Sequence, residues 1–435
     1  MSLNKILKSG KFMLAVYIIL MAILLYARDV IDISVNKNIF IALVILFSLS
    51  LRYENLLSLI LFTLPLMCGV PGNYFLPIWC IIIVFYQIQK KIFNYSILAF
   101  WIVIVLWEIV IYCFYPFEIP TMNVLGYFSA LLLTCLLISE NESIDYSTPV
   151  ICFCLGCCVL LGTIFLMYSR DPSLMYTDGG VRMGGDMYTD TMEMTLKTNS
   201  NNIGFLSSAS IACLFTLFYY KKINVITFMI MAGVSFYCGM FSISRTWAIS
   251  VVLTIIIYSI FQRDNKKVGY AMLCVIAILG SYYLSKNPLL LDAFVGRFEG
   301  DNVETGGQRT VLFAQYNEYL LNHPWNLFFG TSAQLYKEVT GLYHSTHNSL
   351  QQIWMSYGII GFVVIITVYF KALKNNYLKK EYMACMPMLI IVFFLQSIQV
   401  LNPHNGMYPI IAAFFIMKMI KVEKNSSLAR VNFMK

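Results

Sequence analysis

Charged residues are scarce in this chain. Only 12% of its 435 residues are Asp, Glu, Lys or Arg, whereas 59% are hydrophobic; soluble domains usually contain about 25% charged and about 45–50% apolar residues. This shortage excludes a globular enzyme with a single membrane anchor. The formal net charge of +8 is spread over short loops and forms no basic patch with interleaved aromatic residues, so nucleic acid is not expected as a partner.

Cysteine is missing from the hydrophilic segments. All 12 cysteines lie inside apolar runs, and four of them, Cys152, Cys154, Cys157 and Cys158, share one run. The disulfide framework of an exported protein would place cysteines in the outer loops, so none is indicated. A metal cluster in the four-cysteine run is the alternative, but small polarisable residues that pack between helices explain the run without one. We therefore assign no metal and no cofactor.

Long apolar runs fill most of the chain. A bilayer core of about 30 Å requires about 20 apolar residues in a helix, and fourteen runs approach or reach that length. The sequence therefore predicts an all-α polytopic membrane protein with about 14 transmembrane helices, of which the second, from Ile39 to Leu51, is short. The runs begin near Phe12, Ile39, Leu56, Tyr74, Ile97, Thr121, Thr148, Ile203, Ile223, Thr246, Val268, His347, Met383 and Gly406.

Lysine and arginine predict the orientation of these helices. If both termini are cytoplasmic, 20 of the 30 Lys and Arg residues lie in inner segments and ten in outer ones, which fits the positive-inside rule. The two long hydrophilic stretches then fall on the outer, periplasmic side. The predicted organisation is N-terminal transmembrane helices (1–168), an outer loop (169–202), central transmembrane helices (203–285), a large outer loop (286–346) and C-terminal transmembrane helices (347–435).

Two outer arginines are candidate ligands for an anionic group. Arg245 begins a span at the outer boundary, in Ser244-Arg245-Thr246, and its guanidinium presents five donors that suit a phosphate or diphosphate. An arginine that snorkels from a helix end is the alternative. Arg182 precedes Gly184-Gly185 in the first long outer loop, where glycine permits close approach of the backbone; a flexible loop without a ligand is the alternative there.

The large outer loop contains a third arginine and a helical pattern. Arg309 leads into a segment in which Leu312, Tyr316 and Leu320 recur at intervals of four residues. This spacing predicts a short helix with one apolar face. The helix could lie on the membrane surface or pack on the transmembrane bundle.

His347 stands where the large outer loop gives way to a membrane helix. The N-terminus of that helix would favour the neutral imidazole and stabilise an anion nearby. A neutral imidazole can accept a proton from a sugar hydroxyl, as a general base must. A histidine that only caps or flanks the helix is the alternative, and His344, one turn earlier, is the substitute candidate for the base.

These segments together resemble the bacterial O-antigen polymerase and O-antigen ligase superfamily, polymerase type. The similarity covers roughly residues 180–365. It is carried by His347-Asn348 with Leu350, Gly358 and Gly361, by Arg309 with His323-Pro324 and Gly330, by Ser244-Arg245, and by Arg182 with Asn201 and Gly204.

The resemblance implies a glycosyltransferase at the outer face of the bacterial cytoplasmic (inner) membrane. The donor would be an oligosaccharide on undecaprenyl diphosphate, and transfer would be metal-independent and inverting. His347 would activate the acceptor hydroxyl, and Arg245 and Arg182 would hold the diphosphate. Arg309 and Asn348 would be further contacts to the donor.

Two enzyme types share this donor. A polymerase uses lipid-linked glycans as both donor and acceptor, whether the product is O-antigen, capsule or another glycan, and the two sizeable outer loops favour it. An O-antigen ligase, which transfers the glycan to the lipid A core, is the alternative. The family also implies a chain-length-regulating co-polymerase as a partner. A flippase of lipid-linked sugars is less favoured, because Glu108 is the only clear acid within a span and the long loops lie on one face.

Overall fold

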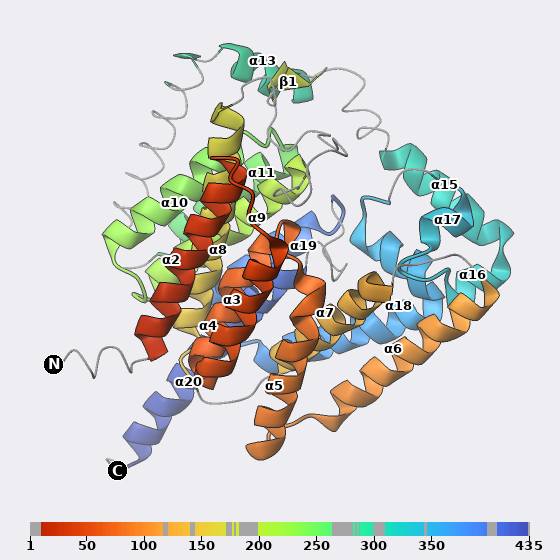
Figure 1. The fold of residues 1–435 in the computed structure, drawn as a ribbon, viewed down its shortest axis with the longest axis horizontal. Helices are drawn as coiled ribbons and strands as arrows, with labels where there is room; N and C mark the ends of the chain where they lie inside the picture. Colours follow the sequence, from red (N-terminus) through yellow and green to blue (C-terminus); the bar gives the residue numbers. More distant parts are fainter. Residues whose placement is uncertain are drawn as a thin grey trace.

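The structure is a computed structural model of the chain. It describes residues 10–115, 121–139, 144–170, 176–177, 180–181, 199–262, 282, 285–286, 288–298, 309–342, 346–397 and 407–433. These residues are almost entirely helical, which confirms the predicted all-α class (Figure 1).

Thirteen of the fourteen predicted apolar runs coincide with helices, and the run predicted from Val268 lies outside the described residues. The helices are α2 (Gly10–Asp29), α3 (Lys37–Ser50), α4 (Tyr53–Thr63), α5 (Leu76–Gln89), α6 (Tyr95–Phe114), α7 (Thr121–Ser139), α8 (Ser147–Arg170), α9 (Ser200–Tyr219), α10 (Val225–Met240), α11 (Arg245–Phe261), α18 (Ser349–Asn376), α19 (Tyr382–Phe394) and α20 (Met407–Phe433).

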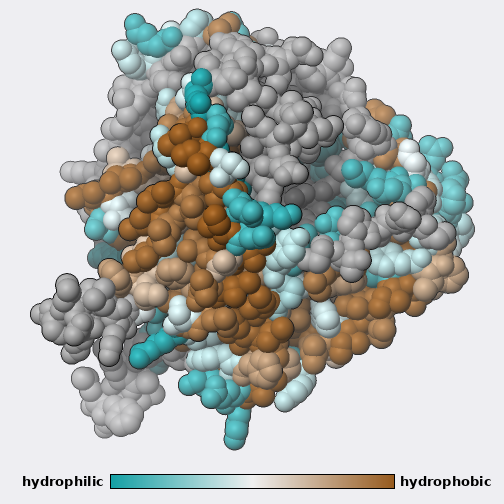
Figure 2. All heavy atoms as spheres, in the orientation of Figure 1, coloured by the Kyte–Doolittle hydropathy of each residue, from teal (hydrophilic) through white to brown (hydrophobic). Residues whose placement is uncertain are grey.

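Five of these helices are long and apolar enough to cross a membrane by length and composition, namely α2, α6, α8, α9 and α18. Several others are apolar but only 10–17 residues long. Figure 2 shows hydrophobic residues over the sides of the bundle. Leu46, Phe85 and Leu106 are among the large hydrophobic side chains that are exposed. Such surfaces are stable in lipid and not in water. The chain is thus an integral membrane protein, while the count of 14 crossings stays a prediction.

The remaining elements lie between the apolar helices. In the two stretches predicted to be outer, the described residues form an antiparallel pair of two-residue strands and four short helices, and α13 lies against β2. The elements are η1 (Leu64–Cys68), η2 (Gly72–Tyr74), β1 (Tyr176–Thr177), β2 (Gly180–Val181), α13 (Pro288–Phe298), α15 (Arg309–Asn322), α16 (Pro324–Phe329) and α17 (Tyr336–Thr340).

Asparagine begins many of the helices. The side-chain oxygens of Asn36, Asn94, Asn199, Asn224 and Asn348 each accept a hydrogen bond from a backbone N–H two or three residues further on. These caps satisfy N–H groups that have no partner within the helix. Local sequence therefore fixes where α3, α6, α9, α10 and α18 start.

Polar contacts join helix ends at one end of the bundle. Arg28, at the end of α2, forms an ion pair with Asp29 (2.8 Å) and donates to the Gly69 carbonyl (2.7 Å) just after η1. Arg170, the last residue of α8, forms an ion pair with Asp32 (2.6 Å). The outer-side ends expected for the first, third and seventh spans thus meet.

The opposite end has its own polar cluster. Glu381, before α19, accepts a hydrogen bond from Tyr220 (2.6 Å) after α9 and forms an ion pair with Lys424 (2.7 Å) of α20. Lys222 pairs with Glu423 beside them. These are the inner ends expected for their helices, so the predicted alternation holds for the helices joined by these contacts. The start of α2 and the end of α20 lie at this same end (Figure 1).

Candidate functional site at converging helix ends

Arg245 is the first residue of α11. The chain leaves α10 and reverses through Ile243, whose φ of 47° is unusual for a β-branched residue. Ser244 then caps α11, its hydroxyl accepting from the Trp247 N–H (3.4 Å). The arginine is half-buried, and this tight turn fixes its backbone at an end of the bundle that the sequence predicts to face outward.

His347 and Asn348 form the corresponding start of α18. His347 is half-buried with a left-handed φ of 48°. The Asn348 side-chain oxygen accepts from the N–H groups of Leu350 and Gln351, both at 3.0 Å. That oxygen is engaged as a cap, so only the Nδ2 group of Asn348 is placed to contact a ligand.

The end of α19 brings these two helix starts together. The Ser349 N–H donates to the Leu395 carbonyl (2.7 Å), and the hydroxyls of Thr246 and Ser397 lie 3.0 Å apart. Arg245 directly precedes Thr246, and His347 lies two residues before Ser349. Two positions separated by 102 residues in sequence are thus held around one helix terminus.

The start of α9 joins the same group. A Cβ atom at Gly204 would lie 3.0 Å from the Cβ of Ser244 and 3.1 Å from that of Trp247, so glycine allows α9 to contact the first turn of α11. The rings of Phe205 and Phe394 lie 5.1 Å apart, which packs α9 on α19. The N-termini of α9, α11 and α18 therefore converge, and their three partial positive charges outnumber the partial negative charge at the end of α19. This arrangement, with Arg245, favours an anion.

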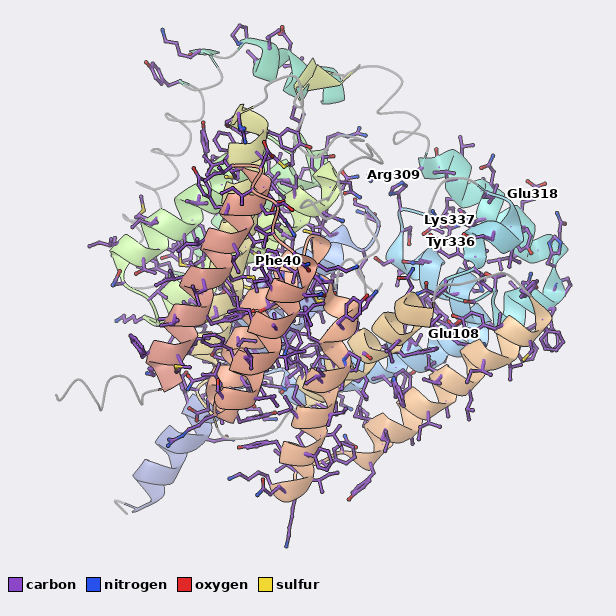
Figure 3. All side chains as sticks on the ribbon, in the orientation of Figure 1. Phe40, Glu108, Arg309, Glu318, Tyr336 and Lys337 are labelled. Carbon is purple, nitrogen blue, oxygen red and sulfur yellow. The ribbon has the colours of Figure 1, made fainter. Side chains whose placement is uncertain are left out.

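Arg309 approaches from α15. The Gln351 side chain of α18 donates to the Phe313 carbonyl (3.0 Å) and to Asn317 (3.3 Å), one and two turns after Arg309. Further along both helices, Leu320 packs in one cluster with Met355. The contacts advance in the same direction along α15 and α18, so Arg309 lies toward the end that carries His347. Figure 3 shows Arg309 at the bundle side of α15 and Glu318 pointing away.

The apolar face predicted for α15 packs inward. Tyr316 and Leu320 are fully buried against Tyr336 of α17 and Met355 of α18. Burial raises the pKa of the Tyr316 hydroxyl, which keeps it neutral. Of the two predicted settings for this helix, packing on the bundle is the one observed.

Two of the predicted site residues, Arg182 and His344, lie outside the described residues. Within the described part of the chain, no group of His, Cys, Asp or Glu is arranged to hold a metal ion. The four-cysteine run contributes to packing instead: Cys154 donates to the Ser210 carbonyl of α9 and Cys158 to the Met231 carbonyl of α10.

Sequence reasoning missed the residues that hold the site together. Thr246, Ser397, Leu395 and Gln351 connect α11, α15, α18 and α19, and no spacing in the sequence relates them. It also missed a break in α18 at Gly358, where φ is 62° and ψ is −173°. The glycine itself was visible in sequence, but an interrupted helix was not expected.

The fold and site define an integral membrane protein with an anion-favouring cluster of helix ends on one side of its bundle. Residues 230–366 match the family model described as O-Antigen ligase. The matched range runs from α10 to α18 and includes Arg245, Arg309 and His347. The match supports the O-antigen polymerase and ligase superfamily and confirms the resemblance seen in the sequence. No curated protein and no solved structure matches the chain.

Proposed function

We propose that this chain is a polymerase that joins glycan repeat units carried on undecaprenyl diphosphate, at the outer face of the bacterial cytoplasmic membrane. The observation that carries the proposal is the convergence of Arg245 and His347 around the end of α19. One supplies a permanent cation for a diphosphate, and the other supplies a base for an acceptor hydroxyl. The match of residues 230–366 to the family model supports the same class of reaction.

His347 acts as the general base. Its neutral imidazole accepts the proton of the acceptor hydroxyl, while that oxygen forms a bond to the anomeric carbon of the donor. The bond from the anomeric carbon to the diphosphate oxygen breaks at the same time, and the lipid diphosphate leaves from the opposite face. The configuration at the anomeric carbon is therefore inverted.

The diphosphate is held by side chains more than by free backbone groups. In α18 the N–H groups of Ser349, Leu350 and Gln351 donate to Leu395 or Asn348. The helix end therefore contributes its electric field, and direct contacts to oxygen come from arginines. Arg245 and Arg309 fill this role together with Arg182, and they stabilise the charge that develops on the leaving group.

An O-antigen ligase is the second candidate. The description of the matching family names this activity, and a ligase would use the same donor site with a lipid A core as acceptor. We favour the polymerase because the two stretches that the sequence predicts on the outer side, 169–202 and 286–346, are both long. A chain-length-regulating co-polymerase is the partner that we propose for this reaction.

A lipid-linked sugar transporter is the third candidate. The interrupted α18 and the buried Glu108 are features that transporters share. The family match supports a transferring enzyme instead, and the helix-end site lies at one end of the bundle rather than at its middle.

The test is the glycan ladder of cells whose own copy is replaced by a variant. We expect His347→Ala, His347→Gln and Arg245→Ala to abolish polymerisation while single repeat units still reach the surface acceptor. The matched control is Arg170→Ala, because the ion pair of Arg170 with Asp32 is exposed. This control should keep the ladder at wild-type protein levels.

Other outcomes discriminate between the candidates. Full-length polymer that accumulates on the lipid carrier with none attached would identify a ligase. Lipid-linked repeat units that stay on the inner side of the membrane would identify a transporter. An undiminished ladder in the His347 and Arg245 variants would refute the proposed site.

A further inference from the structure

The break in α18 is filled by a loop from the large outer stretch. At Gly358 the helix is interrupted, and the carbonyls of Met355 and Ser356 accept hydrogen bonds from the N–H groups of Thr331 (2.8 Å) and Ser332 (3.0 Å). Gly330, with φ of 83°, makes this approach possible, because a Cβ there would lie 2.3 Å from the Ser356 carbonyl oxygen. The segment after α16 is thus inserted against the unwound turn.

One face of α6 holds this segment from the other side. Trp107 donates to the Phe329 carbonyl (2.8 Å), and Tyr115 donates to the side-chain oxygen of Asn326 (2.8 Å). Between them, Glu108 accepts the N–H of Ala333 at 3.0 Å. Glu108 lies between α6 and α18 in Figure 3.

Glu108 is a carboxyl group without a charged partner among the described residues. Its side chain is 0% exposed on a helix that is a candidate membrane span. Within the described residues, no lysine, arginine or histidine forms an ion pair with it, and its Oε2 atom has no hydrogen-bond partner. An isolated carboxylate in such a place is very costly. A bound proton or metal cation would remove this cost.

The surroundings of Glu108 are rich in oxygen. The hydroxyls of Tyr112, Ser332 and Tyr357 are near enough to interact with the carboxyl group, although none forms a regular hydrogen bond to Oε2. Tyr127 of α7 is a further titratable group close by. The first segment of α18 also ends here, and the C-terminal end of a helix attracts a cation. Unwound helices with such oxygen ligands bind Na⁺ or protons in other membrane proteins.

We propose that Glu108 is the anionic ligand of a buried monovalent cation site at the break in α18, occupied by Na⁺ or by a proton. A divalent ion is not expected, because Glu108 is the one carboxylate that the described residues place there. The bound charge neutralises Glu108 and allows it to hold residues 331–333 against α18. This inference does not rest on the proposed function, and its test measures stability.

The experiment follows thermal unfolding of the purified full chain in detergent. The unfolding midpoint is compared in NaCl and in choline chloride at equal ionic strength, across pH 6 to 8.5. For a Na⁺ site, Na⁺ should raise the wild-type midpoint, because ligand at 100 times its Kd shifts the folding equilibrium about 100-fold. The variant Glu108→Gln should lose this response, since it keeps the shape and the acceptor for Ala333 without the charge.

Two further variants sharpen the test. Glu318→Gln is the matched control, because Glu318 is an exposed acid on α15 (Figure 3), and it should respond to Na⁺ as the wild type does. Tyr112→Phe removes one ligand oxygen next to Glu108 and should weaken the apparent affinity for Na⁺ about tenfold. It tests the site even if Glu108→Gln fails to fold.

Each outcome decides the matter. If a proton supplies the charge, the wild type is insensitive to Na⁺ but loses stability as pH rises, because the proton leaves, and Glu108→Gln abolishes that loss. If Glu108→Gln and Tyr112→Phe both respond to Na⁺ and pH as the wild type does, there is no cation site and Glu108 is only a hydrogen-bond acceptor for Ala333.

Discussion

Replacing Gly358 by alanine should strongly destabilise the protein. The residue has φ of 62° and ψ of −173°, a conformation that is essentially restricted to glycine. A Cβ there would lie 2.1 Å from the Phe328 carbonyl oxygen and 2.3 Å from the Phe329 nitrogen, which are backbone atoms and cannot rotate away. The alanine must therefore push residues 328–332 out of the break. Backbone strain and the loss of two inter-segment hydrogen bonds together cost about 3–5 kcal/mol.

Two other glycines separate the contributions to this cost. Gly341 is also left-handed, with φ of 68°, but a Cβ there meets nothing within 4 Å. Gly341→Ala should therefore lower the unfolding free energy by about 1–2 kcal/mol, which is the backbone strain of a left-handed alanine. Gly162 is helical in α8 with open space around it, so Gly162→Ala should be neutral or stabilising by up to about 1 kcal/mol.

The assay is thermal unfolding of the purified variants, followed by tryptophan fluorescence at one heating rate. The midpoints should rank Gly162→Ala highest, then Gly341→Ala, then Gly358→Ala. A Gly358→Ala protein as stable as Gly341→Ala would show that the loop does not approach the helix at this point. A Gly358→Ala protein as stable as Gly162→Ala would show that α18 is continuous.

Further predictions concern the contacts that fix helix ends. Arg28→Ala removes the ion-pair partner of Asp29, of whose surface only 4% is exposed. This change should lower the unfolding free energy by about 3–5 kcal/mol. The double variant Arg28→Ala/Asp29→Asn should recover part of this loss. Gln351→Leu removes the hydrogen bonds to Phe313 and Asn317. It should lower the glycan-transfer rate by about tenfold at normal protein levels, since a positioning error of about 1 Å can cost up to about 100-fold. A wild-type rate would exclude a positioning role for this contact.

The sequence was sufficient to predict most of the helices, for a physical reason. Bilayer thickness sets the length of an apolar run, and a cap such as Asn199 or Asn348 marks where a helix begins. His347 and Arg245 could be selected in the same way, because both stand at helix starts on the side of the long loops. These features are local, so they can be read without knowing the packing.

The convergence of those residues could not be predicted, because it depends on contacts between distant segments. Nothing in the sequence relates Thr246 to Ser397, yet their hydroxyls lie 3.0 Å apart and align two helix starts. The same holds for Glu108 and Ala333, which are separated by 225 residues. Side-chain contacts of this kind follow from how helices pack, and packing is set by shape complementarity over many residues at once.

The first segment of α18 links both proposals. It is fixed at its start by the bond from Ser349 to Leu395, along its side by Gln351, and at its end by the bonds from Thr331 and Ser332. A side chain at the head of a segment held at three points has little freedom, and catalysis requires a base that is placed to within about 0.5 Å. Neutralising Glu108 would therefore help to fix the position of His347, because both residues act on this segment, although they do not contact each other directly. The break at Gly358 limits the rigid unit to this short segment and leaves the remainder of α18 to follow the membrane bundle.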